Sequence, residues 1–275
     1  MKIMSLNVWG GRRIAKLLLF LATSKDRETD VFCFQEIFSS PCIASRFGKT
    51  EGMEFNLFSQ IAQTLPQHTG FFAPTSDHMD VIGDQWVGGR YSKERCPVSI
   101  GNAIFVRKGL DIEGVGDLFV YGNRNSKALK QSAFSPKSLQ YVVIRNEKDR
   151  YSLFNFHGLW NGGGKKDCPE RLEQSKRIVD FMSRFSGKKI LCGDFNLDPE
   201  TESIADIEYN GKMVNLIKKY DIRSTRTKLY RDYETGSLFA DYAFASQDVL
   251  VGAFYVDSGE SAEVSDHAPL LLICK

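Results

Sequence analysis

The sequence predicts an α/β fold in which two mixed β-sheets pack together and helices cover their outer faces. Short apolar runs alternate with segments of helical periodicity along the whole chain. Nine such runs are too many for a simple six-stranded open sheet. Two of them, Leu139–Arg145 and Tyr151–His157, are joined by a short polar turn, which is typical of an antiparallel hairpin. The sheets are therefore expected to be mixed.

Nine segments are expected to be strands, because each is a short apolar run next to polar residues. They are Lys2–Trp9, Val31–Ile37, Gly101–Arg107, Leu139–Arg145, Tyr151–His157, Lys188–Asp194, Asp241–Ala245, Val251–Val256 and Pro269–Cys274. Four helices follow from apolar residues spaced three or four apart, as in Ile14, Leu17 and Leu21. They are Ile14–Thr23, Glu54–Leu65, Pro169–Phe185 and Met213–Tyr220. Two long segments, Pro74 to Ser99 and Tyr121 to Ser138, are expected to be loops.

The composition excludes disordered and fibrous proteins. Hydrophobic residues make up 42% and charged residues 25% of the 275 residues, which is ordinary globular usage. Because the chain has no repeat, low-complexity segment or convincing linker, we expect one domain over residues 1–275. The net charge of +2 neither requires nor excludes a nucleic-acid partner, since basic residues can cluster on one face.

The cysteines and the N-terminal segment indicate a reducing compartment. None of the six cysteines forms a C-x-x-C pair, so no zinc site is expected. Cys33 and Cys192 lie in apolar runs and are interpreted as buried, reduced thiols, which predicts a cytoplasmic location. The apolar stretch after Arg12 and Arg13 is short and lacks a cleavage site, so it is interpreted as a core helix. No stretch is long enough to span a membrane, and no stable membrane anchor is expected.

Polar residues recur where the predicted strands end or begin. Taken singly, each has an ordinary explanation, because Asn or His at a strand end often caps a turn. Taken together, they indicate a site, since an ionised carboxylate is costly to bury unless it is paired or bound to a cation. Glu36, Asp194 and Asp266 each adjoin strongly apolar sequence. If these acids converge, their repulsion calls for a hard cation such as Mg²⁺.

Six blocks carry a resemblance to a known family. They are SLNVWG, CFQEIF, FNFHGLWN, GDFNLDP, ADYAFAS and SDHAPL, in this order. The chain resembles the endonuclease/exonuclease/phosphatase family, which includes deoxyribonuclease I, abasic-site endonucleases, tyrosyl-DNA phosphodiesterase, neutral sphingomyelinases and inositol-polyphosphate 5-phosphatases. The similarity runs from near the first residue to near the last. It implies a four-layer α/β sandwich with two central mixed sheets, and one catalytic domain of this family over residues 1–275.

The resemblance implies which residues bind the metal ion and the phosphate. Glu36 matches the carboxylate that binds the essential Mg²⁺ in this family. Asn7 would lie beside the metal and the phosphate, and Asp266 would be an additional acid on the metal side. Asn161 would also contact phosphate.

The resemblance implies catalytic roles for five further positions. Asp194 would orient or deprotonate the attacking water, and Asn196 would hold a phosphate oxygen. His267 would contact the scissile phosphate, while Asp241 would keep its imidazole charged and oriented. His157 would stabilise charge or deliver a proton near the leaving group.

The expected function is that of a Mg²⁺-dependent phosphodiesterase or nuclease, with Mn²⁺ as an alternative cation. Its expected partner is a phosphate-ester substrate, namely nucleic acid, and the chain is expected to be a monomer. Two alternatives stay open. NVWG resembles the sphingomyelinase branch as much as the nucleases, so the substrate could be a phospholipid or phosphoinositide. A catalytically silent binding protein is less expected, because the main metal and histidine positions are all present.

Three further sequence features could be functional, but each also has an ordinary structural interpretation. Lys137 belongs to a basic set that is interpreted either as a rim for a polyanion or as a solvated surface. The stretch from Asn161 to Lys166, NGGGKK, lacks the spacing of a phosphate-binding loop and is interpreted as a flexible connector. Arg171 and Gln174 match positions of the family, yet a solvated amphipathic helix explains them as well.

Overall fold

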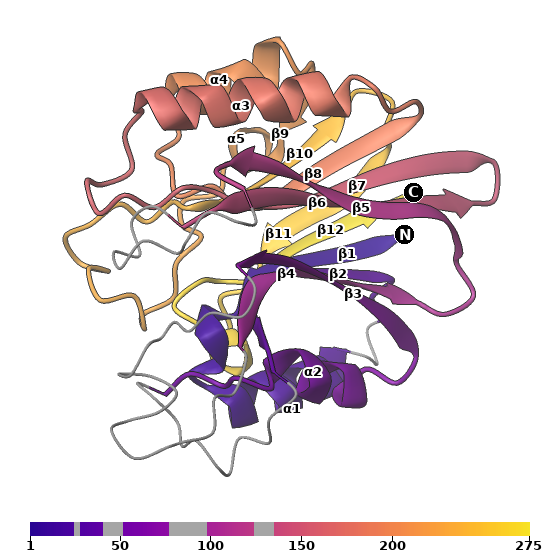
Figure 1. Cartoon of the computed structure of the whole chain (residues 1–275), viewed down its shortest axis with the longest axis vertical. Coiled ribbons are helices and arrows are strands. Elements are labelled where there is room, and N and C mark those ends of the chain that lie inside the picture. Colours follow the sequence, from indigo (N-terminus) through magenta and orange to yellow (C-terminus); the bar gives the residue numbers. More distant parts are fainter. Residues whose placement is uncertain (25–27, 41–51, 77–97, 124–134) are drawn as a thin grey trace.

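The computed structural model describes residues 1–24, 28–40, 52–76, 98–123 and 135–275. Its strands form two six-stranded sheets (Figure 1). The first sheet has the order β11-β12-β1-β2-β4-β3, with β1 (Lys2–Asn7), β2 (Val31–Ser39), β3 (His68–Ser76), β4 (Ser99–Arg107), β11 (Val251–Val256) and β12 (Leu270–Cys274). The second has the order β5-β6-β7-β8-β10-β9, with β5 (Asp111–Tyr121), β6 (Lys137–Asn146), β7 (Asp149–His157), β8 (Lys188–Asp194), β9 (Met213–Asn215) and β10 (Asp241–Ser246).

Helices cover the outer face of each sheet, which makes four layers (Figure 1). The first sheet is covered by α1 (Ile14–Ser24) and α2 (Leu57–Thr64). The second is covered by α3 (Pro169–Met182) and α4 (Glu202–Tyr209), with α5 (Leu216–Lys219) beside β9. Two short 3₁₀ helices, η1 (Trp9–Gly11) and η7 (Glu260–Ala262), lie in loops. The predicted α/β sandwich of two mixed sheets is confirmed.

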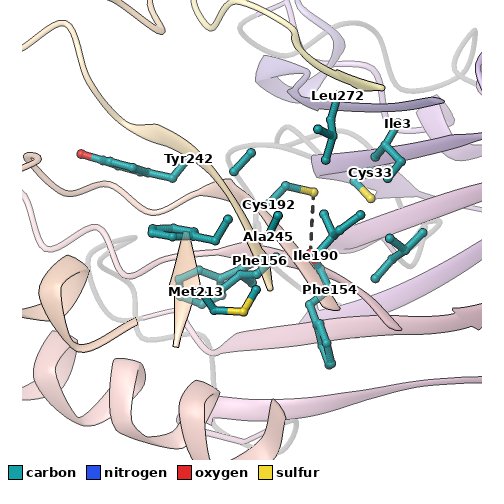
Figure 2. Close-up of a cluster of buried hydrophobic side chains, with 14 of the residues drawn as sticks. Ile3, Cys33, Phe154, Phe156, Ile190, Cys192, Met213, Tyr242, Ala245 and Leu272 are labelled. Carbon is teal, nitrogen blue, oxygen red and sulfur yellow. Dashed lines mark hydrogen bonds between the residues drawn. The ribbon is translucent and has the colours of Figure 1, made fainter. Parts of the chain in front are cut away.

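The inner faces of the two sheets bury one apolar core. Figure 2 shows Ile3, Cys33 and Leu272 of the first sheet facing Ile190 and Cys192 of the second. All five side chains are buried, and burying one large apolar side chain contributes about 1.5–3 kcal/mol. Cys33 and Cys192 are free thiols, as the sequence predicts, and the Cys192 thiol donates to the Phe154 carbonyl over 3.6 Å.

Two edge strands, β3 and β5, are not predicted by the sequence. Gly70 and Pro74 interrupt β3, and two glycines interrupt β5, so neither segment has a clean strand pattern. Both strands lie at the edge of a sheet, where such residues are tolerated. Gly116 in β5 packs against the ring of Tyr141, where a Cβ atom would lie only 2.8 Å away.

The expected helix from Met213 to Tyr220 is partly wrong, and α4 is missed. Residues Met213–Asn215 pair with β10 as the short strand β9. The helix α5 begins only after Asn215, because the Asn215 side chain accepts the backbone N–H of Ile217 at 3.0 Å and caps it. The α4 segment is short and follows Pro199 closely, so its pattern is weak.

The two expected loops are shorter than predicted at their ends. Pro74–Ser76 belongs to β3 and Ser99 opens β4, while residues 77–97 lie outside the described residues. Tyr121 ends β5 and Lys137 opens β6, while residues 124–134 also lie outside them. None of the helices in the described residues is long and apolar enough to cross a bilayer.

The strand directions bring distant segments to one edge of the sandwich. Strands β1 and β2 are parallel, as are β7 and β8, so each pair ends on the same side. Strand β10 is antiparallel to β8, and β12 is antiparallel to β1, so their first residues meet those ends. In register, His157 lies beside Asp194, which lies beside Asp241. The topology therefore gathers chemistry from six separate segments.

Candidate active site

Asp194, the last residue of β8, lies at the centre of the polar cluster. It is 1% exposed, and its two carboxylate oxygens have different partners. Oδ2 accepts from the Asn7 amide at 2.9 Å, and Oδ1 accepts from the backbone N–H of Asn196 at 2.9 Å. Gly193 allows this placement: its φ is 141°, and a Cβ there would lie 1.9 Å from the Phe156 carbonyl.

The loop after Asp194 separates a packing residue from a polar one. Phe195 is 2% exposed and stacks edge-on against Phe156 at 5.0 Å and Tyr242 at 5.4 Å, which confirms that it packs in the core. Asn196 has φ 55°, a left-handed conformation that Asn tolerates better than most residues. Its side-chain amide lies 3.5 Å from the Gly158 carbonyl, so it stays beside Asp194.

Glu36 enters the site because β2 is irregular at this point. The pairing register of β2 with β4 shifts between Phe34 and Ile37, and Glu36 has φ 58°. Such bulges re-aim side chains and are concentrated at functional sites. The Asn7 amide donates to Glu36 at 3.1 Å, so one amide links Glu36 to Asp194.

Burial and neighbouring acids together disfavour the ionised form of Glu36. Burial, opposed by the Asn7 amide and reinforced by the charges of Asp266 and Asp194, raises the pKa of Glu36 from 4.5 to about 7. A carboxylate in this position is ionised at neutral pH only at a cost, unless a cation shares the site. These oxygen donors are the type preferred by Mg²⁺.

Asp241 and His267 form a hydrogen-bonded pair beside Asp194. His267 Nδ1 lies 2.8 Å and 2.9 Å from the two Asp241 oxygens, and both residues are buried. The Thr225 hydroxyl accepts the backbone N–H of Asp241 at 3.2 Å and so anchors the start of β10. Because Nδ1 faces Asp241, Nε2 is left to face the site.

The protonation of this pair differs from the sequence-based expectation. Burial, and then the charge of Arg226, lower the pKa of His267 from 6.5 to about 4. Burial also raises the pKa of Asp241 from 3.8 to about 7. His267 is thus not a permanently charged imidazole, and the pair shares a proton that it gains or loses near neutrality.

Both histidines approach the same Asp194 oxygen without bonding to it. Oδ2 lies 3.8 Å from His157 Nε2 and 3.7 Å from His267 Nε2, and Asp266 Oδ1 lies 3.9 Å from His267 Nε2. These separations exceed hydrogen-bond lengths. Burial, followed by the charge of Lys137, lowers the pKa of His157 well below 6.5, so its imidazole is neutral.

Two groups of residues near Asp194 are candidates for holding a cation: one contains Asp241 and His267, and the other contains Glu36. Ligand atoms of Asp194, Asp241 and His267 lie within 4.8 Å of one another. However, Asp241 and His267 already satisfy each other through Nδ1, which leaves them poorly suited as ligands. Glu36 is different, because burial and, to a smaller degree, the charges of Asp266 and Asp194 disfavour its ionised form, while its hydrogen-bond donor is the uncharged Asn7 amide. The Glu36 side is therefore the better candidate for a cation.

The structure does not link Asn161 to this cluster. Its side chain accepts the backbone N–H of Gly163 at 2.9 Å and lies 3.8 Å from the Cys168 sulfur. Within the described part of the chain, both contacts stay inside one loop. The proposed phosphate contact of Asn161 stays a prediction.

Lys137 is a site residue that sequence reasoning did not single out. It is 8% exposed rather than part of a rim, and Glu36 and Asp194 oppose the lowering of its pKa by burial. A Lys at the first residue of β6, directly after Pro136, gives no periodic signal of burial. Its charge at this point favours an anionic ligand.

Arg171 and Gln174 are buried on α3, not solvated. Arg171 donates to the Leu159 carbonyl at 3.1 Å and to the Lys166 carbonyl. Gln174 accepts the Leu159 N–H at 3.2 Å. These contacts fix the loop between β7 and α3, so the NGGGKK stretch is held at both ends.

We expect Glu36→Gln to stabilise the cation-free protein by about 1–2 kcal/mol near pH 8, and to have no effect near pH 4. The raised pKa means that the folded state keeps a proton that the unfolded state releases. Stability from this group is therefore present below pH 4.5 and is lost as the pH rises through about 7. Glu36 is half-buried, so the gain is smaller than the full shift would give.

Thermal unfolding of both proteins across this pH range, with and without Mg²⁺, measures the effect. Mg²⁺ should raise the melting temperature of the wild type near pH 8 and that of the variant much less. If the difference in stability between the two proteins did not depend on pH, ionisation of Glu36 would not be the cause of the destabilisation.

Comparison of the sequence with known protein families gives a match over most of the chain. The profile of the Endonuclease/Exonuclease/phosphatase family matches residues 4–267. The comparison with curated proteins found no match.

Solved structures resemble the chain over its whole length. A mannosyl-6-phosphatase from Bacteroides thetaiotaomicron superimposes with a TM-score of 0.68 at 17% identity, covering 100% of this chain and 99% of that one. An endonuclease/exonuclease/phosphatase family protein from Leptotrichia buccalis gives 0.68 at 15%, covering 100% and 99%. A humanized TDP2 from D. rerio gives 0.60 at 13%, covering 100% and 98%. At these identities the likeness concerns the fold.

Proposed function

Because the chain belongs to the Endonuclease/Exonuclease/phosphatase family, we propose that it is a Mg²⁺-dependent hydrolase of phosphate esters that acts as a phosphodiesterase on nucleic acid. One observation carries this proposal. The buried acids, amides and histidines predicted from separate segments converge around Asp194, with Glu36, Asn7 and Asp241–His267 on its flanks.

The donor set fits a hard divalent cation, Mg²⁺ or Mn²⁺. Glu36 and Asp266 would hold it, with Asn7 beside it, since these residues supply oxygen atoms and excess negative charge. When bound, such a cation neutralises phosphoryl oxygens and stabilises the charge that develops during hydrolysis. Asp194 and Lys137 border the same space, because both influence the pKa of Glu36.

Asp194 is assigned to the attacking water. Its Oδ1 is fixed by the Asn196 N–H and its Oδ2 by the Asn7 amide, so the carboxylate is held rigidly. A water beside Oδ2 would transfer its proton to Asp194 while its oxygen bonds to phosphorus, and the bond from phosphorus to the leaving oxygen breaks. No covalent intermediate on the protein is needed.

The remaining residues are assigned to the phosphate. His267, oriented by Asp241, would donate from Nε2 to a phosphoryl oxygen when the pair holds its extra proton. Asn196 would hold a second oxygen, and Lys137 would balance charge on the Glu36 side. His157 is neutral, which favours hydrogen bonding at the leaving oxygen over proton delivery from an imidazolium.

A phosphomonoesterase is the second candidate function. It is favoured by one observation: a mannosyl-6-phosphatase has this fold over 100% of the chain with a TM-score of 0.68. The two candidates share the chemistry at phosphorus and differ in whether the phosphate carries one ester or two.

Two chromogenic substrates test both candidates. We expect the purified protein with Mg²⁺ to hydrolyse bis-p-nitrophenyl phosphate faster than p-nitrophenyl phosphate, and EDTA to abolish both activities. A preference for the monoester would favour the phosphatase. Activity that EDTA leaves unchanged, or no activity with either substrate in Mg²⁺ or Mn²⁺, would overturn the metal-dependent hydrolase.

Two further properties stay proposals. The family match over residues 4–267 supports a single catalytic domain over the chain. The described cysteines are free thiols, which supports a reducing, cytoplasmic compartment.

A further inference from the structure

Two cations share one aromatic ring next to His267. The guanidinium carbon of Arg226 lies 4.4 Å from the centroid of the Tyr230 ring, and Lys165 Nζ lies 5.1 Å from the same centroid. Arg226 is 7% exposed and Lys165 is 6% exposed. Like charges at such close quarters repel each other, and the charge of Arg226 adds to burial in lowering the pKa of Lys165 to about 8.

Both cations keep unused hydrogen-bonding capacity in the described part of the chain. Arg226 donates from one terminal nitrogen to Asp266 at 3.0 Å, while its buried Nε has no hydrogen-bond partner there. Among the described residues, Lys165 donates to two carbonyls, those of Ser237 at 3.0 Å and Phe239 at 2.5 Å, and has no carboxylate at ion-pair distance. Buried charge is costly unless it is paired, so the Lys165 ammonium favours an anion from outside.

Backbone contacts hold the two cations rigidly. Arg226 pairs with His267 in an antiparallel bridge, and the Thr227 N–H donates to the Asp266 carbonyl at 3.2 Å. Lys165 is fixed by its own carbonyl, which accepts the Asp198 N–H at 2.8 Å. Rigid donors lose little entropy when a ligand binds.

The cations of the site lie on both sides of Asp194. Lys137 acts on Glu36 and His157, at one side of Asp194. Arg226 acts on His267 and Asp241, at the other side. The site therefore has a cation on each flank of Asp194, and the scissile phosphate is assigned to only one part of it.

Arg226 lies close to the proposed phosphate contact, His267. The Asp266 carboxylate between them is 3.0 Å from Arg226 and 3.9 Å from His267 Nε2, so a strand held at His267 passes next to Arg226. Trp160, which is 40% exposed on the same loop as Lys165, offers a flat surface on which a base could stack.

We propose that Arg226 and Lys165, braced by Tyr230, form a subsite for the phosphate next to the scissile one in a polynucleotide. The subsite rests on the proposed function, because it extends the same active site. It assigns the substrate class: a nucleic acid strand with consecutive phosphates, gripped at two of them.

Binding of thymidine 3′,5′-bisphosphate tests the subsite independently of strand direction, since either phosphate can occupy the scissile position. We expect it to bind the full chain in Mg²⁺ about tenfold or more tightly than thymidine 5′- or 3′-monophosphate, measured by calorimetry. Lys165→Met and Arg226→Gln should each remove most of this advantage.

Two surface variants are matched controls for the change in charge. Lys166 has a side chain that is 78% exposed and Arg223 one that is 83% exposed, so Lys166→Met and Arg223→Gln should keep the advantage. Equal affinity for bisphosphate and monophosphates, or an advantage that survives in both Lys165→Met and Arg226→Gln, would overturn the subsite. Should Arg226→Gln not fold, Lys165→Met decides alone.

The binding arm separates the two proposals. Hydrolysis without any bisphosphate advantage would leave the hydrolase standing and remove the subsite. Tighter binding of the bisphosphate that depends on Lys165, without any hydrolysis, would support the subsite and remove the hydrolase. Inositol 1,4-bisphosphate is the second probe, and tighter binding than the thymidine compound with the same dependence on Lys165 would overturn the polynucleotide assignment.

Discussion

Asp194→Asn is expected to lower kcat for phosphodiester hydrolysis by on the order of 10³-fold, the range attributed to loss of a positioned general base. The substitution keeps the size and shape of the side chain but removes its charge and its ability to accept a proton. KM should change little, because the proposed phosphate contacts come from Asn196 and His267. Steady-state kinetics with bis-p-nitrophenyl phosphate in saturating Mg²⁺ measures both constants.

Folding of the Asp194→Asn variant should be nearly unchanged. The amide can serve only one of its two donors, Asn7 or the Asn196 N–H, with its oxygen, which costs about 1 kcal/mol. Loss of the negative charge relieves repulsion with Glu36 and offsets this cost. Thermal unfolding separates an inactive folded variant from an unfolded one.

Asp221→Asn is the matched control for Asp194→Asn. The Asp221 side chain is 73% exposed and pairs with Arg223 at the surface. Its φ of 51° also suits Asn, so stability and kcat should match the wild type. If Asp194→Asn kept more than about a tenth of wild-type activity, the assignment of the general base would be wrong.

The strands that carry the site could be predicted because their apolar runs are long and continuous. Lys188–Asp194 is correct to the residue, and Tyr151–His157 lies within β7. Both are central strands buried on two faces, so their sequence has little freedom. Edge strands such as β3 have no such constraint. In β3, Gly70 and Pro74 interrupt the apolar pattern by which a strand is recognised in the sequence.

The acids and histidines of the site could be predicted for a related reason. Asp194 and Asp241 interrupt apolar sequence at strand ends, and a buried charge in such a place has few structural explanations. Lys137, Lys165 and Arg226 could not be found in this way. They lie at the start of a strand or in loops, where a basic residue is ordinary, and only the fold shows that they are buried.

Substitution of the Asp241–His267 pair should also lower activity strongly. We expect Asp241→Asn to lower kcat/KM by on the order of 10²–10³-fold, because Asn cannot stabilise a proton on His267. His267→Gln should cause a similar loss. The double variant should be no worse than His267→Gln alone, since Asp241 is proposed to act through His267. Additive losses in this cycle would show that Asp241 has a separate role.

The pH profile of kcat/KM distinguishes positioning of His267 from a merely structural contact. The raised pKa of Asp241, about 7, means that the pair holds its extra proton below neutrality and loses it above. Donation from His267 Nε2 is therefore lost as the pH rises through about 7, which gives an alkaline limb. Asp241→Asn should remove this limb, because the pKa of His267, about 4, leaves its imidazole neutral throughout the neutral range.

Glu36 should produce an acid limb in the pH profile of kcat/KM. The dependence on Mg²⁺ concentration distinguishes this acid limb from the alkaline limb of the Asp241–His267 pair. Its carboxylate must be ionised to hold Mg²⁺, so activity rises as the pH increases through about 7, the raised pKa of Glu36. More Mg²⁺ competes with the proton and moves this acid limb to lower pH. The alkaline limb involves no proposed ligand and should stay in place. If both limbs moved together with Mg²⁺, His267 and Asp241 would themselves be ligands, and the cation would belong on their side of Asp194.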